Sequence, residues 1–212
     1  MGAFRIAVLA SGTGTNLQAI LDTLHGRDGI EVACVASNKP AAQALARAAE
    51  AGVETGVFPR TENQGRAQRD AAMADWLTDR EVDLVVLAGY MELLSSEFVR
   101  RFPNRIVNVH PALLPSFPGL DAVGQALEHG VAVTGVTVHF VDEGVDSGPI
   151  ILQRAVAVPY TRDRSQLERQ IHEVEHQLLP EAIRLIAAGA ARVDAGNRRI
   201  VHVEEPARAG DG

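Results

Sequence analysis

Residues 106–119, IVNVHPALLPSFPG, place an amide and an imidazole where an apolar run ends. Side chains two apart in an extended strand point to the same side, so Asn108 and His110 would face one ligand together. Pro111 holds His110 in an extended conformation, and two further prolines stiffen the loop that follows. An amide donor beside a protonated imidazole suits a carbonyl oxygen that becomes negative during attack. The segment therefore predicts carbonyl chemistry at the end of a strand.

A protonated histidine is favoured by a neighbouring carboxylate, and the turn VDEGVDSGP supplies candidates. Asp146 is the first choice, while Asp142 and Glu143 compete for the role on sequence alone. A histidine before a proline can also be a hydrogen-bonded loop residue without chemistry. His139, in the run before the turn, could line the site or pack inside the protein. The sequence thus predicts a His110 that one of three carboxylates keeps protonated.

A glycine-rich segment, VLASGTGTNLQAI, joins the first apolar run directly to a helical pattern. Gly12 and Gly14 allow a tight turn and close approach of a ligand, and Thr15 and Asn16 lie where exposed amides and the helix dipole meet an anion. The segment is not G-x-G-x-x-G and no Lys follows, so neither the dinucleotide fingerprint nor the nucleotide-triphosphate loop fits. Phosphate binding and a plain capped turn both remain open.

Short apolar runs alternate with amphipathic or alanine-rich segments, which predicts an α/β fold with a mainly parallel sheet and helices on both faces. The expected strands are 5–10, 31–37, 83–88, 105–109, 133–141 and 150–158. The expected helices are 16–24, 41–51, 66–78, 122–128 and 164–188. The last two strands are joined by a short turn and should form an antiparallel hairpin, and a small edge hairpin around Gly196 should follow. Ligands of such sheets bind at the carboxyl ends of the strands, where both polar segments lie.

Composition limits the class of protein. The chain of 212 residues is 46% hydrophobic, enough for one sizeable core, and its formal net charge of −7 disfavours nucleic acid as the main partner. One cysteine, Cys34, gives no disulfide framework and fits the reducing cytoplasm. The N-terminal FRIAVLA predicts a first strand rather than a signal peptide, and no segment is long enough to span a membrane. We expect a cytoplasmic protein without membrane or nucleic-acid partners.

Four segments are similar to those of the phosphoribosylglycinamide formyltransferases, a branch of the folate-dependent formyltransferase family. They are SGTGTNLQAI, LAGYMELLSSEF, NVHPALLPSFPG and VTVHFVDEGVDSGPIILQ. The match runs from about residue 6 to residue 188, in order and without a large insertion. The N-x-H-P-x-L-L-P segment and the later Asp recur across folate formyl-transfer relatives, so they specify the chemistry. The GTGTN loop resembles the branch whose acceptor carries a sugar phosphate.

The resemblance implies a reaction and a role for each matched residue. A formyl group would pass from the co-substrate 10-formyltetrahydrofolate to the amine of 5'-phosphoribosylglycinamide by direct attack, without a metal. Asn108 and His110 would stabilise the oxyanion, and Asp146 would keep His110 protonated. The acceptor would be bound by Gly14, Thr15, Asn16 and Glu175. The reduced folate would be bound by Arg66, Met91, Glu92, Leu93, Leu94, Asn108, Asp142, Glu143, Gly144 and Val145.

It also implies a Rossmann-like formyltransferase fold in one domain, residues 1–203, as a monomer or homodimer. A phosphate-binding half would reach to about residue 100, a folate-binding and catalytic half would start at about 101, and residues 204–212 would form a disordered tail. Two positions depart from the pattern: Glu92 stands where relatives often have Arg or Lys, and Asp121 where a His is common. Hydrolysis of formyltetrahydrofolate by the same residues, or anion binding without chemistry, are the alternatives.

The segment HEVEH, residues 172–176, matches the H-E-x-x-H pattern of zinc proteases. The pattern has only three fixed positions and lies in a helix rich in Glu and His. Zinc catalysis also needs a third protein ligand, and no downstream signature supplies one. We therefore expect no metal, and place Glu175 with the acceptor instead.

Overall fold

The computed structural model describes residues 2–60 and 65–204, and a seven-stranded sheet forms its centre. In spatial order the strands are β3 (Glu54–Val57), β2 (Ile30–Ser37), β1 (Phe4–Leu9), β4 (Leu84–Leu87), β5 (Ile106–His110), β6 (Val133–Phe140) and β7 (Ile150–Ala157). The strands from β3 to β5 are parallel, whereas β6 pairs antiparallel with both β5 and β7. The predicted α/β class, with a mainly parallel sheet and an antiparallel C-terminal part, is confirmed.

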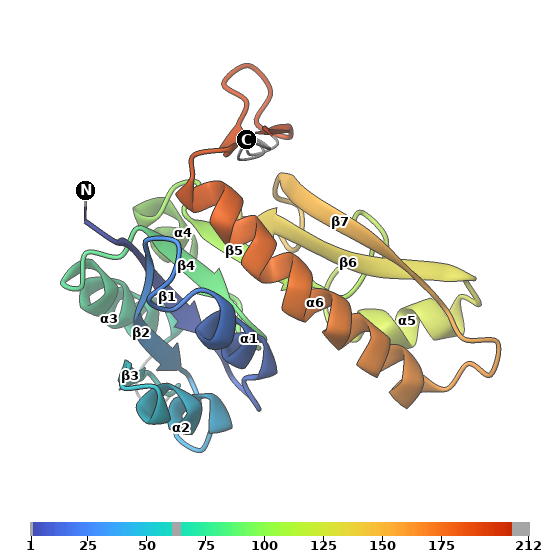
Figure 1. Cartoon of the computed structure of the whole chain (residues 1–212), viewed down its shortest axis with the longest axis horizontal. Coiled ribbons are helices and arrows are strands. Elements are labelled where there is room, and N and C mark those ends of the chain that lie inside the picture. The colour runs from blue at the N-terminus through green and yellow to red at the C-terminus, as the bar shows by residue number, and fades with distance from the viewer. Residues whose placement is uncertain (1, 61–64, 205–212) are drawn as a thin grey trace, which may run out of the picture.

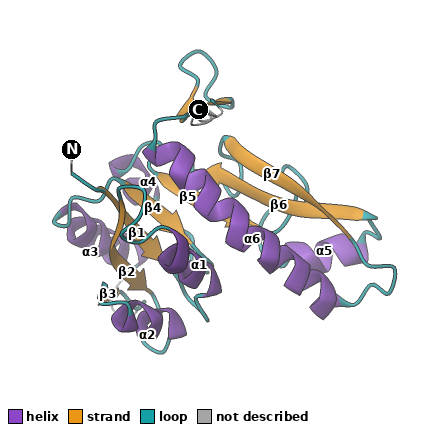
Figure 2. Ribbon diagram, in the orientation of Figure 1, coloured by secondary structure: helices purple, strands orange, loops and turns teal. Residues whose placement is uncertain are grey.

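Helices cover both faces of the sheet (Figures 1 and 2). They are α1 (Thr15–Thr23), α2 (Gln43–Glu50), α3 (Arg66–Thr78), α4 (Ser96–Arg101), α5 (Ala122–Glu128) and α6 (Arg164–Ala187). α1 and α6 pack with one face, and α3 and α4 pack with the other. Figure 1 shows α6 running obliquely past β6 and β7, so this last helix joins the parallel and antiparallel parts.

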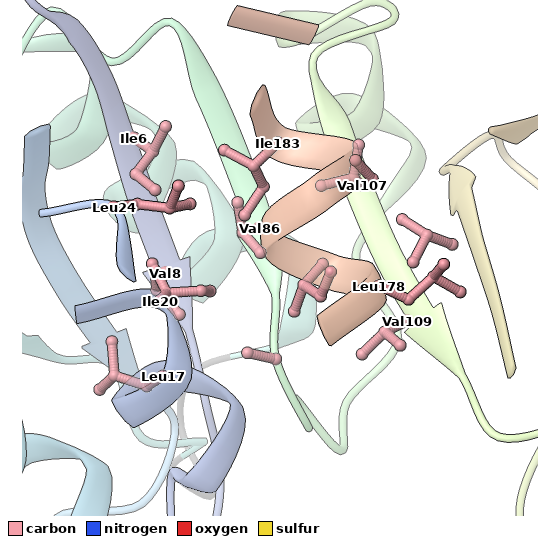
Figure 3. Packing of buried hydrophobic residues seen from close by; sticks show 14 of the residues in the cluster. Ile6, Val8, Leu17, Ile20, Leu24, Val86, Val107, Val109, Leu178 and Ile183 are labelled. Atoms are coloured by element: carbon pink, nitrogen blue, oxygen red, sulfur yellow. The ribbon is translucent and has the colours of Figure 1, made fainter. Parts of the chain in front are cut away.

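The core follows from strand alternation. Ile6 and Val8 of β1 belong to the cluster beneath α1 and α6, and Figure 3 shows this packing; Ala7 and Leu9 belong to the cluster beneath α3 and α4. A parallel sheet covered on both faces needs such uninterrupted apolar strands. The result is a rigid platform whose strand ends are fixed in space.

The expected elements are present, with boundaries shifted by up to two residues, and two further elements were missed. β3 is a four-residue edge strand with mostly exposed side chains, so it lacks apolar alternation. α4 has only six residues, and its visible signal is Ser95, whose hydroxyl accepts a hydrogen bond from the Phe98 amide. The expected edge hairpin is β8 (Ala191–Val193) with β9 (Val201–Val203). Of the expected tail, residues 205–212 lie outside the described residues.

Hydropathy along the described helices adds one finding: none of them combines the length and apolar character that crossing a membrane requires.

Candidate active site

A cavity of about 850 Å³ opens at the carboxyl ends of β1, β4 and β5. Segments that leave these strands line it, at 12–16, 87–94 and 108–111, together with residues of α6 and the loops 119–123 and 141–146. The chain runs from β1 to β2 and β3 on one side, then crosses to β4 on the other side. Open α/β sheets bind ligands at such a switch point. The cavity therefore lies where the fold class predicts a site.

The glycine-rich loop forms one end of this cavity. Gly14 is the cap residue of α1 with φ of 74°, and a Cβ on it would lie 2.8 Å from the Cα of Ala44. Both the backbone angle and the close approach require glycine. Because a glycine occupies the cap position, no cap side chain satisfies the first backbone N–H groups of α1, which leaves them for an anion.

Asn16 joins the start of α1 to the middle of α6. Its Nδ2 donates a hydrogen bond of 2.9 Å to Glu175 Oε2, across 159 positions of the sequence. Its Oδ1 is buried and has no hydrogen-bond partner among the described residues. Burial raises the pKa of Glu175, although the Asn16 hydrogen bond and the nearby His172 act to lower that pKa. The pair therefore forms a buried polar surface with unused hydrogen-bonding capacity.

The other polar group lies at the end of β5. Antiparallel pairing places Asn108 opposite His139 of β6, and Asn108 Nδ2 lies 3.2 Å from His139 Nε2. Asn108 Nδ2 also donates to Asp146 Oδ1 at 3.5 Å. His139 Nδ1 donates to the Phe140 carbonyl at 2.8 Å, so Nε2 accepts from Asn108 when the ring is neutral. His139 is thus both packed and part of the site, which joins the two roles that the sequence left open.

Asp146 reaches these residues from the turn between β6 and β7, where its φ is 48°. Its Oδ2 accepts a hydrogen bond of 2.7 Å from the Gly119 amide and lies 3.4 Å from His110 Nδ1. Burial works to raise the pKa of Asp146, but the nearby His139, the hydrogen bond from the Gly119 amide and the nearby His110 outweigh it and lower that pKa. Asp146 is therefore a carboxylate held in its ionised form.

The competing carboxylates have other contacts. Asp142 Oδ1 accepts hydrogen bonds from the Gly144 amide and the Ser147 hydroxyl, so it shapes its own turn. Glu143 pairs with Arg100 at 3.4 Å on the surface. Of the three candidates, Asp146 is the one that lies beside His110.

Comparison with known proteins identifies the group to which this architecture belongs. The model of the formyl transferase family matches residues 4–183. The chain belongs to the formyl transferase family. It is 42% identical over 190 residues to the phosphoribosylglycinamide formyltransferase of Haemophilus influenzae, covering 89% of this chain and 90% of that protein. A solved structure, glycinamide ribonucleotide transformylase 1 from Symbiobacterium toebii, superposes with a TM-score of 0.91 at 50% identity, covering 96% and 95% of the two chains.

Relatives with several activities also match this formyl transferase. The trifunctional purine biosynthetic protein adenosine-3 of Drosophila melanogaster is 45% identical over 192 residues. The match covers 89% of this chain but only 14% of that protein, so the chain corresponds to a small part of it.

In this formyl transferase the residues expected to bind folate line the same cavity as the catalytic candidates. They are Arg66, Met91, Glu92, Leu93, Leu94, Asn108, Asp142, Glu143, Gly144 and Val145. Gly14, Thr15, Asn16 and Glu175 line it as well. Met91 and Leu93 are exposed large apolar side chains. The structure brings every residue expected to act in catalysis or binding to this one cavity, and their individual roles remain predictions.

The cavity of the formyl transferase is also lined by charged residues that the sequence did not indicate as part of the site. Arg164 begins α6, and its Nη2 lies 2.7 Å from Asp121 Oδ1 while its Nε donates to Glu168 at 2.7 Å. Asp121 also caps α5, since its side chain accepts from the Gly124 amide. The fold brings this helix start to the cavity, which no local sequence pattern could indicate.

In the structure, residues of the zinc-protease pattern contact one another and Asn16. The rings of His172 and His176 stack with centroids 6.3 Å apart, and Glu175 between them hydrogen-bonds Asn16. Within residues 2–60 and 65–204 no group of three or more His, Cys, Asp or Glu side chains is arranged to hold a metal ion.

Proposed function

We propose that this formyl transferase is a phosphoribosylglycinamide formyltransferase of purine biosynthesis, which moves the formyl group of 10-formyltetrahydrofolate to the amine of 5'-phosphoribosylglycinamide. The observation that carries the proposal is one cavity that joins an uncapped helix start, suited to an anion, to a partly buried Asn-His-Asp group. The similarity to a phosphoribosylglycinamide formyltransferase over 90% of that protein's length supports the same acceptor.

The acceptor occupies the end of the cavity beside α1. Its phosphate binds the backbone amides of Gly14, Thr15 and Asn16, where the helix dipole favours negative charge. Its ribose hydroxyls donate to Glu175, whose carboxylate has only Asn16 as a hydrogen-bond partner in the described structure. These contacts direct the amine toward β5.

The formyl group lies beside Asn108 and His110. The free amine attacks the formyl carbon, a C–N bond forms, and the carbonyl oxygen becomes negative beside an amide and an imidazolium. The bond from carbon to N10 then breaks, His110 gives a proton to N10, and the proton lost by the amine restores the imidazolium. Asp146 stabilises the charged ring throughout. No covalent enzyme intermediate is needed.

The contacts of His110 support this role. Its Nε2 lies 2.8 Å from the Phe117 carbonyl and its Nδ1 faces Asp146. An oxygen atom therefore faces each of the two ring nitrogens. When the ligand binds, His110 Nε2 must leave the Phe117 carbonyl and contact an oxygen or nitrogen of the ligand instead.

The folate occupies the other end of the cavity. Its pterin lies against backbone groups of residues 91–94 and 142–145, and Arg66 offers a positive charge to its anionic tail. The exposed side chains of Met91 and Leu93 provide apolar surface for the ring system between these ends.

The test is loss of formyl donor with and without acceptor. The purified chain should consume 10-formyltetrahydrofolate only when 5'-phosphoribosylglycinamide is present, with one formylated product per donor. Turnover without acceptor would instead indicate a hydrolase, and binding of both ligands without turnover would indicate a module that has lost its chemistry.

A further inference from the structure

A second buried ionic group lies behind the folate end of the cavity. Arg69 of α3 is 1% exposed and Asp70 is fully buried, and the Nε and Nη2 of Arg69 donate to Asp70 Oδ1 at 2.9 and 2.7 Å. Burial acts to lower the pKa of Arg69, and its contacts with Asp70, Tyr90 and Glu92 outweigh that effect and raise it. The guanidinium is therefore a permanent buried charge.

The same guanidinium reaches the wall of the cavity. Arg69 Nη1 lies 3.2 Å from Glu92 Oε2, and Glu92 is 28% exposed. Arg69 Nη1 has no hydrogen-bond partner among the described residues, so its contact with Glu92 is an ion pair. Met91 and Leu93 on either side of Glu92 point outward and are exposed. Glu92 thus lines the cavity as its two neighbours do, but its carboxylate lies against the buried Arg69.

The wall segment, residues 89–95, is also held at both ends. At its start, the Met91 amide donates to Ser11 Oγ at 2.8 Å. At its end, the Ser95 amide donates to Asp70 Oδ2 at 2.6 Å. Asp70 thereby binds Arg69 with one oxygen and the wall segment with the other. Between the two ends, the Glu92 contact with Arg69 is the ion pair that the described structure provides.

We propose that Arg69 is a positioning residue for the folate end of the cavity, acting through Glu92 and Asp70. It draws the Glu92 carboxylate away from the ligand space and fixes the backbone of residues 91–94. Without this pairing, the carboxylate would repel an anionic ligand tail and compete for Arg66. The assignment of this end to folate rests on the proposed function, whereas the positioning of the wall segment does not.

The test compares Glu92→Ala with Glu92→Gln, and with Glu97→Gln as the matched control. Glu97 is an exposed carboxylate of α4 whose partner, Arg100, is exposed too. Amide hydrogen exchange is measured at Met91 and Ser95, because both amides donate hydrogen bonds. In Glu92→Ala we expect exchange at Met91 to become about three- to tenfold faster, in the range of one partly buried ion pair. Glu97→Gln should match the wild type.

Steady-state kinetics give the second readout. Glu92→Ala should raise the KM for the formyl donor by about three- to tenfold and leave kcat and the KM for the acceptor within about twofold. Glu92→Gln, which keeps an acceptor for Arg69, should recover part of the loss. Equal changes in both KM values, or no change in either, would overturn the inference.

Arg69→Met and Arg69→Lys test the guanidinium itself. Met leaves two carboxylates without a partner and can prevent folding, so the Glu92 variants decide in that case. Lys keeps the charge but loses the paired contacts, and exchange at Met91 should lie between wild type and Glu92→Ala. Unchanged exchange in Glu92→Ala would refute the positioning role at any level of activity. A wild type without formyl transfer would refute the proposed function, while the exchange comparison would still decide the role of Arg69.

Discussion

Two aspartates in this protein have side chains that are largely or fully buried. They differ in whether their partners can change charge. Asp146 faces the cavity and lies between two histidines, an asparagine amide and the Gly119 amide. Asp70 lies behind the cavity wall and binds the guanidinium of Arg69 and the Ser95 amide. An imidazole near neutral pH can gain or lose a proton, whereas a guanidinium cannot.

The difference shows how one fold separates chemistry from support. The partners of Asp146 can change charge during a reaction, and its distances of 3.4 and 3.6 Å to the histidines leave room for rearrangement. The contacts of Asp70 are 2.6 to 2.9 Å long, and its charged partner, Arg69, keeps a fixed charge. Mutations should therefore separate the two, since one aspartate should affect rate and the other stability.

Asp146→Asn should give the largest effect. It removes the charge that favours protonated His110, so kcat should fall by about 10²- to 10⁴-fold, the contribution typical of general acid catalysis. The melting temperature should change little, because the Gly119 amide still finds an acceptor. Asp79→Asn, at an exposed position after α3, is the control. Near-normal turnover in Asp146→Asn would show that a different carboxylate acts.

Asp70→Asn should reverse this pattern. It leaves Arg69 as a buried charge with half of its partners, and loss of one member of a buried pair costs about 3–5 kcal/mol. Urea unfolding should show that loss, while the kcat of the folded fraction should remain within about tenfold of wild type, the residual deficit arising from the wall segment. A stable but inactive variant would contradict the proposed division.

Asn16→Leu should change the KM for one of the two substrates. It removes the contact with Glu175 and a buried oxygen that has no partner among the described residues, so the KM for the phosphorylated acceptor should rise by about ten- to a hundredfold. The KM for the formyl donor should stay within about threefold. Initial rates with each substrate varied in turn give both constants. Equal increases would mean that the two ends of the cavity are not separate.

Glu175→Gln should give the smallest effect on stability, and a favourable one. Its raised pKa means that the folded protein binds this proton more tightly than the unfolded chain. The ionised form therefore costs stability above the folded pKa, and the cost disappears as the pH falls below the unfolded value of about 4.3. Thermal melts should show an increase of about 2–4 °C at pH 8, equivalent to about 1 kcal/mol, that shrinks toward pH 4. A uniform increase across this range would exclude titration as its cause.

Much of the fold could be predicted because the information is local. The strands around Val8, Val86 and Val107 are continuous apolar runs, and α3 and α5 have clear helical patterns. β3 could not be predicted from its alternation, because it is an edge strand whose neighbour supplies the pairing. α4 is too short for periodicity to indicate it.

The site divides in the same way. Asn108 and His110 were predicted because two residues on one strand share a face, but the choice of Asp146 over Asp142 required the turn conformation. Arg69 looks like one more arginine of a helix start in sequence. Its role depends on contact with Glu92 across the fold, which no local pattern encodes.

The bond between Asn16 and Glu175 sets the order in which a newly made chain could become competent. The two residues are separated by 159 positions, so the acceptor end acquires its second side only when α6 has been synthesised and has docked. Domains begin to fold while the ribosome is still adding residues. A nascent chain with its first sheet strands complete would therefore hold an open, one-sided anion site, and this site would gain its second side only after α6 has been synthesised.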